Sequence, residues 1–120
     1  MSYKSQVALS LSHDLKNEIV AKAKTRLTVN EYVIIQAMLT GKDTDYFFEN
    51  EHGILVYFEK TQWNPHYPEI KLIQEFFSNE SNQSNFMFLR IGDDTDDVEN
   101  VGKFNKVKPM TFDICIRIID

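Results

Sequence analysis

The segment Phe86–Glu99 reads FMFLRIGDDTDDVE, and the interpretation of the fold starts from it. Its first half, Phe86–Ile91, is a run of apolar and aromatic residues with the length and composition of a buried β-strand. The strand pattern stops at Gly92. Five carboxylates follow within seven residues: Asp93, Asp94, Asp96, Asp97 and Glu99. The segment therefore predicts a central strand that places an acidic loop at one end of a β-sheet.

The first third of the chain predicts one strand and two helices. Residues 7–11 alternate between larger apolar and small side chains, which is the period of a half-buried strand. Apolar residues then recur at every fourth position over residues 15–27, and this pattern is typical of an amphipathic helix. The segment Thr28–Glu31 has capping-box spacing, so a second helix is expected over residues 29–40. The β-branched residues within Tyr32–Ile35 would also suit a strand.

The remaining segments predict a hairpin, a third helix and a last strand. Residues 45–49 and 54–60 are largely apolar and flank a short polar loop that ends in glycine, which is typical of a β-hairpin. Pro68 suits the first turn of a helix whose apolar stripe continues to Phe77. Apolar residues alternate with other residues over Phe112–Ile118, and this pattern predicts the last strand.

These elements follow the order strand, helical region, strand, strand, helix, strand, with one strand added at the end. The first six match the ferredoxin-like βαββαβ arrangement. We therefore expect an α+β, two-layer sandwich in which helices cover one face of a mostly antiparallel sheet and the other face is open to water or a partner. The extra C-terminal strand would pair beside Phe86–Ile91. A length of 120 residues fits one domain over residues 1–120.

Composition and charge exclude several classes of function. The single cysteine, Cys115, cannot form an internal disulfide, and the chain has neither a membrane-spanning apolar run nor a signal-peptide pattern, so we expect a cytoplasmic protein without membrane contact. The formal net charge is −5, and no cluster of Lys and Arg is present, which disfavours direct nucleic-acid binding. The four glycines cannot form a nucleotide-binding loop, and no cofactor is expected.

The acidic loop has three interpretations. It could be a solvated loop that needs no ligand, it could bind a basic surface on another protein, or it could hold Mg²⁺ or Ca²⁺ through its carboxylates. The EF-hand spacing fails, because the turn glycine and the distal glutamate are absent at their required positions. Arg90 lies in the apolar strand just before Gly92, and we expect it to form an internal ion pair with the loop, since an unpaired buried arginine is costly.

The aromatic residues Trp63, Tyr67 and Tyr57 form the second candidate surface. They could belong to an exposed aromatic patch that binds a partner, or Trp63 could close one end of the core. The three histidines have no metal-ligand or catalytic spacing, and Cys115 lies among isoleucines in a predicted strand. The sequence therefore predicts a protein that is not an enzyme.

Three blocks of the sequence carry a resemblance. They are MSYKSQVA at Met1–Ala8, Trp63 with YPEI at Tyr67–Ile70, and FLRIGDD with DVE within Phe88–Glu99. In these blocks the chain resembles a group of small, mostly uncharacterised bacteriophage and prophage proteins, although Gln6 replaces an aspartate common in that group. The resemblance implies an accessory phage protein in the bacterial cytoplasm, and it brings no catalytic residues with it.

The leading hypothesis is a small acidic phage or prophage accessory protein that acts by protein–protein interaction, as an inhibitor of a host defence or nucleic-acid-handling enzyme. Its partner would be a host or phage protein with a basic surface, contacted by seven residues: Asp93, Asp94, Asp96, Asp97, Glu99, Trp63 and Tyr67. One alternative is a metal-dependent hydrolase or nuclease that uses the carboxylates with Arg90. Another is an immunity or antitoxin-like protein. A homodimer through the open sheet face or the edge strands is also left open.

Overall fold

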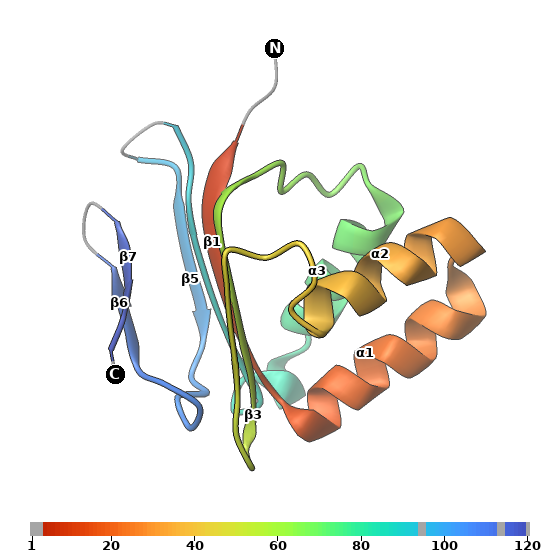
Figure 1. Ribbon diagram of the computed structural model, residues 1–120, viewed down its shortest axis with the longest axis horizontal. Coiled ribbons are helices and arrows are strands. Elements are labelled where there is room, and N and C mark those ends of the chain that lie inside the picture. Colours follow the sequence, from red (N-terminus) through yellow and green to blue (C-terminus); the bar gives the residue numbers. More distant parts are fainter. Residues whose placement is uncertain (1–3, 94–95, 113–114, 120) are drawn as a thin grey trace.

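A five-stranded antiparallel sheet lies at the centre of the structure, a computed structural model that describes residues 4–93, 96–112 and 115–119 (Figure 1). The strands follow the spatial order β2-β3-β1-β4-β5, and every neighbouring pair is antiparallel. Their bounds are β1 Ser5–Ser12, β2 Tyr46–Glu49, β3 Gly53–Thr61, β4 Phe86–Ile91 and β5 Val98–Gly102. The expected α+β class with a mostly antiparallel sheet and helices on one face is confirmed.

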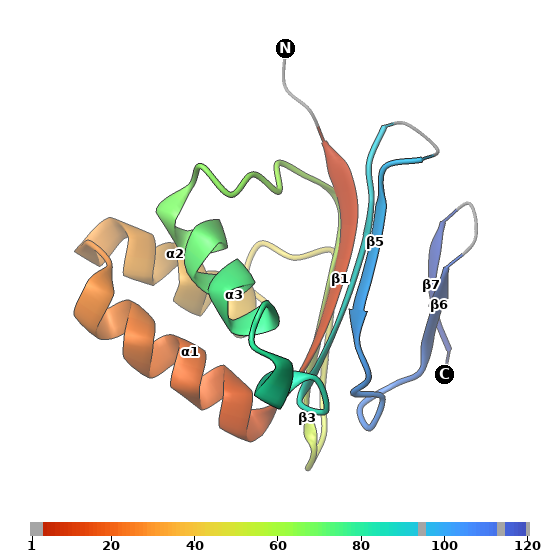
Figure 2. The ribbon, with the colours of Figure 1, turned by 180° about the vertical axis from the view of Figure 1, so that it is seen from behind.

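Three helices cover one face of this sheet, as the two opposite views show (Figures 1 and 2). They are α1 His13–Arg26, α2 Val29–Leu39 and α3 Pro68–Phe77, and a short 3₁₀ turn, η1 Glu80–Asn82, follows α3. Each helix begins where local chemistry favours a start. The Ser12 hydroxyl accepts a hydrogen bond from the Leu15 amide, and Thr28 and Glu31 form the predicted capping box.

The larger core lies between the helices and the sheet. Alternate residues of β1 point toward the helices, which follows from the two-residue period of a strand. Aromatic rings fill the space below α3: Phe77 stacks on Phe86 with ring centroids 4.2 Å apart. The buried side chains that join sheet and helices include Val7, Leu9, Leu11, Leu15, Ile19, Ile35, Leu39, Ile54, Val56, Ile73, Phe77, Phe86 and Phe88.

The opposite face of the sheet is covered by a second, smaller layer. Strands β6 Met110–Phe112 and β7 Ile116–Ile118 form a two-stranded antiparallel sheet that packs against it (Figures 1 and 2). Met110 and Ile116 are buried there against a second apolar cluster of the large sheet. The expectation that this face is open is therefore wrong for the part beneath the hairpin.

The prediction of one last strand over Phe112–Ile118, paired beside β4, is also wrong. The position beside β4 belongs to β5, which the sequence analysis missed, and the predicted strand is divided between β6 and β7. Antiparallel pairing places Met110 opposite Ile118, so these two apolar side chains face the same way. The same alternation therefore fits one long strand or a hairpin, and periodicity alone cannot distinguish them.

A glutamine on β1 ties the hairpin to the sheet. The pairing of β1 with β3 shifts between Ser5 and Val7, and Gln6 lies at this irregularity. Its amide oxygen accepts a hydrogen bond from the Ile116 backbone N–H at 2.7 Å. Its amide nitrogen donates to the Tyr57 hydroxyl oxygen at 2.6 Å. Burial raises the pKa of Tyr57 above its ordinary value of 10.0, and this effect outweighs the opposing hydrogen bond from Gln6.

The raised pKa of Tyr57 predicts a loss of stability at alkaline pH. The unfolded chain releases the phenol proton near pH 10.0, whereas the folded chain holds it to a higher pH. The unfolded state then binds fewer protons, so the free energy of unfolding falls as the pH rises above about 10. We expect urea denaturation between pH 8 and 11 to show a shallower decline for Tyr57→Phe than for wild type; equal slopes would contradict it.

Candidate functional site

The predicted acidic segment forms the turn between β4 and β5. The Gly92 amide donates a hydrogen bond to the Asp97 carbonyl oxygen at 2.7 Å and closes this turn. The side chains of Asp93 and Asp96 are exposed, whereas Asp97 and Glu99 are partly buried. Asp94 lies outside the described residues. The carboxylates that the sequence analysis treated as one cluster are therefore in different environments.

Arg90 engages the two partly buried carboxylates. Its Nε donates to Glu99 Oε1 at 2.7 Å, and its two terminal nitrogens donate to the two carboxylate oxygens of Asp97. Its Nη1 also donates to the Ser5 hydroxyl at 2.9 Å, which links the network to β1. Arg90 and Glu99 are directly opposite in the register of β4 and β5, where oppositely charged side chains attract. The internal ion pair expected for Arg90 is present. Asp97 and Glu99 therefore have a structural role, because both pair with Arg90.

Removal of the Arg90 guanidinium should destabilise the chain. In Arg90→Met, Asp97 and Glu99 lose the guanidinium with which they pair, and the Ser5 hydroxyl loses a donor. We expect a loss of about 2 kcal/mol in the free energy of unfolding, less than for a fully buried pair because water reaches both carboxylates. Urea denaturation measures it. The control Arg117→Met removes an exposed arginine and should change stability by less than about 0.5 kcal/mol; equal losses in the two variants would contradict the role of Arg90.

The aromatic residues Trp63 and Tyr67 do not form a common exposed patch. Trp63 is 7% exposed, and its ring lies tilted on Phe88 in the helix-side core, with centroids 5.3 Å apart. Tyr67 immediately precedes α3, is exposed, and donates its hydroxyl hydrogen to Gln62 Oε1 at 3.1 Å. Trp63 therefore has little surface to offer a partner, whereas Tyr67 is available.

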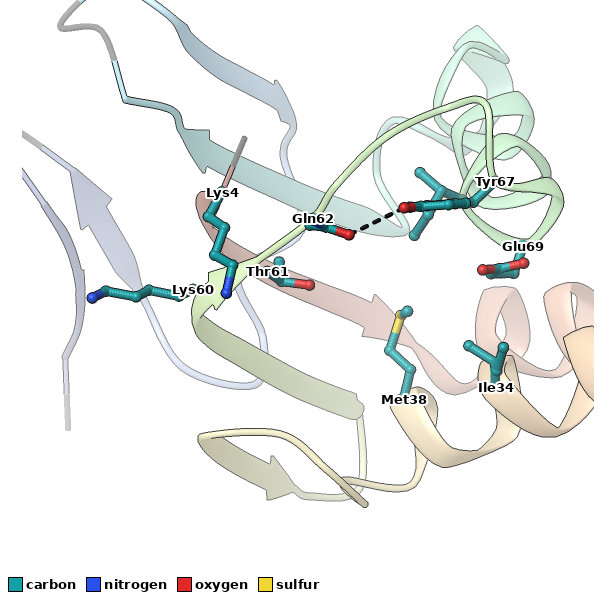
Figure 3. Close-up of a pocket in the computed structure, with 9 residues that line it drawn as sticks. Lys4, Ile34, Met38, Lys60, Thr61, Gln62, Tyr67 and Glu69 are labelled. Carbon is teal, nitrogen blue, oxygen red and sulfur yellow. Dashed lines mark hydrogen bonds between the residues drawn. The ribbon is translucent and has the colours of Figure 1, made fainter. Parts of the chain in front are cut away.

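Tyr67 lines an open groove of about 540 Å³ between α2 and the segment 61–70 (Figure 3). Ile34 and Met38 rise from α2 on one side, and Tyr67 lies across from them. Lys4 and Glu69 lie toward opposite ends of the groove in this view. The full lining is Lys4, Ile34, Met38, Lys60, Thr61, Gln62, Tyr67, Glu69 and Ile70. The groove thus has an apolar middle and charged ends.

The outer surface of α2 continues the apolar lining of this groove. Val29, Val33 and Ile34 are 78%, 54% and 47% exposed, and we call these three side chains the α2 patch. The helix is also apolar on its inner side, where Ile35 and Leu39 are buried. Its only charged residue is Glu31, which serves the capping box. An exposed apolar helix face of this kind is typical of a binding surface.

Sequence reasoning missed the α2 patch, although a signal was present. From Tyr32 to Gly41 the chain contains no charged residue, whereas charged residues make up 26% of the whole sequence. A capped surface helix normally presents charged side chains to water on its outer face. The absence of charge over this segment could have indicated that the predicted helix is apolar on its outer side as well as on its inner side.

The side chains that could bind a metal are dispersed over the described residues. No group of three His, Cys, Asp or Glu side chains within residues 4–93, 96–112 and 115–119 is placed to hold a metal ion. His13 is used structurally, because its Nε2 lies 2.7 Å from the Asn50 carbonyl oxygen. No helix in the same part of the chain is long and apolar enough to cross a membrane. Comparisons of the chain with protein-family models, curated proteins and solved structures found no match.

Proposed function

We propose that this chain acts by protein–protein interaction and that its contact surface is the α2 patch together with the adjacent groove. One observation carries the proposal: a well-capped helix, packed on its inner side, exposes three branched apolar side chains and no charge on its outer side. Each such side chain contributes about 1–2 kcal/mol when a partner covers it, so three neighbours can supply the centre of an interface. Tyr67 adds an aromatic side chain across the groove.

The acidic turn gives weaker support for the same class of function. Arg90 pairs with Asp97 and Glu99, so its one positive charge offsets one of their two negative charges and ties both carboxylates to β4. Asp93 and Asp96 stay exposed and could attract a basic partner, but charged side chains alone are depleted from the centres of interfaces. We therefore assign the main contact to the α2 patch and treat the acidic turn as a surface that steers approach.

The wider context is part of the proposal. A bacteriophage or prophage origin rests on the three sequence blocks, and inhibition of a host enzyme or sequestration of a toxin would both use a protein contact of this kind. A ferredoxin-like arrangement is supported by the order β2-β3-β1-β4 and by the helical connections from β1 to β2 and from β3 to β4. The metal-dependent hydrolase gains no support from the described residues.

A charge placed in the α2 patch should prevent binding without unfolding the chain. In Val33→Glu, a carboxylate would have to be buried in the contact, so we expect captured protein to fall at least about tenfold. Val33 is half exposed and glutamate favours helices, so the free energy of unfolding should change by less than about 0.5 kcal/mol. Immobilised chain is exposed to bacterial lysate and, separately, to purified chain, and bound protein is quantified by mass spectrometry.

A matched control separates the patch from a general effect of added negative charge. Ala21→Glu places the same charge on an exposed position of α1. We expect this variant to capture as much protein as wild type. If Val33→Glu and Ala21→Glu both bind as wild type does, the α2 patch is not the contact surface and the proposal fails.

A further inference from the structure

We propose that the α2 patch and its groove are occupied by a second copy of this chain, related to the first by a twofold axis. The inference rests on the proposed function, because it names the occupant of the same surface. Two features of that surface favour a contact between identical chains. One is the absence of charge along the patch, and the other is the distribution of charge at the ends of the groove.

The patch satisfies the first requirement of a self-contact. A twofold axis places a surface against its own copy, so like charges near the axis would face one another and repel. The outer face of α2 carries none: Val29, Val33 and Ile34 are exposed, and Glu31 is occupied at the helix start. Two copies can therefore bring their α2 helices together antiparallel with apolar side chains and the uncharged Asn30 and Gln36 between them.

The groove satisfies the second requirement, which is opposite charges at opposite ends. Lys4 lies at the end near the start of β1, and Glu69 lies at the end near α3, as Figure 3 shows. Neither side chain forms an ion pair with another described residue. A twofold rotation about the middle of the groove exchanges its ends, so Lys4 of each copy approaches Glu69 of the other. The charges are self-complementary in this arrangement.

This pairing predicts a pattern of rescue that another occupant would not give. In Lys4→Glu, two Glu–Glu contacts replace two Lys–Glu pairs, and in Glu69→Lys, two Lys–Lys contacts replace them. We expect either variant alone to dissociate at about tenfold higher concentrations than wild type, since each dimer contains the pair twice. The double variant Lys4→Glu/Glu69→Lys restores both attractions. An equimolar mixture of the single variants does the same and should form the heterodimer preferentially.

Sedimentation velocity at micromolar concentrations and 0.1 M salt measures the dimer, and circular dichroism checks that each variant is folded. The check by circular dichroism is needed because Glu69→Lys places a cation in the first turn of α3, where it is unfavourable for the helix. We expect wild type, the double variant and the mixture to dimerise, and Val33→Glu to stay monomeric while folded. Ala21→Glu should dimerise as wild type does.

Three outcomes overturn the inference. The first is a wild-type chain that is monomeric throughout the measured range. The second is a dimer that Val33→Glu leaves intact, which would place the contact elsewhere, for example at the sheet edges β2 or β5. The third is a dimer that Val33→Glu abolishes and that the single charge variants weaken, but that neither the double variant nor the mixture of single variants restores. A monomer that still captures a lysate protein through Val33 would overturn this inference and leave the proposed function standing.

Discussion

Strand β1 is the element on which the rest of the structure depends, because it is paired on both edges and covered on both faces. It forms antiparallel ladders with β3 and with β4, its odd-numbered residues Val7–Leu11 face the helices, and Ala8 faces the hairpin layer. The close approach of β3 requires glycine at its first position. A Cβ at Gly53 would lie 1.9 Å from the Leu11 carbonyl oxygen, which no side chain can accommodate.

The parts of the fold that the sequence predicted are those with local signals. The helix starts at Ser12 and Thr28 depend on caps within three residues, and β1 and the β2–β3 hairpin depend on alternation and a glycine-ended loop. Strand β5 has no comparable signal, since VENVG is short, has only two apolar side chains and lies at the sheet edge. It forms because β4 offers a free edge and because Arg90 attracts Glu99 across it. The attraction acts between two strands, so the pattern of apolar residues within one strand cannot reveal it.

The features of the candidate site also divide into those with a local sequence signal and those that depend on the fold. The internal pairing of Arg90 could be predicted, because a lone arginine in an apolar strand requires a partner and carboxylates follow directly. Which carboxylates it engages could not, since Asp97 and Glu99 reach it only through the turn and the register of β5. The exposure of the α2 patch depends on how α2 is rotated about its own axis, and packing against α1, α3 and β3 determines that rotation. The sequence shows that this helix is almost free of charge, but it does not show which of its apolar side chains are exposed.

The acidic turn, which was predicted from the sequence, and the groove beside α2, which was not, meet at one end of the sheet. Because β1 and β4 are antiparallel, with Gln6 opposite Ile91, the start of β1 lies beside the acidic turn. A second hollow at this end is lined by Lys4, Lys60, Gly92 and Asp93 among others, so Lys4 borders both the groove and the turn. Negative charge in the turn therefore lowers the positive electrostatic potential at Lys4. The two surfaces are electrostatically coupled through this lysine, and a substitution in the turn also changes the charge balance of the groove.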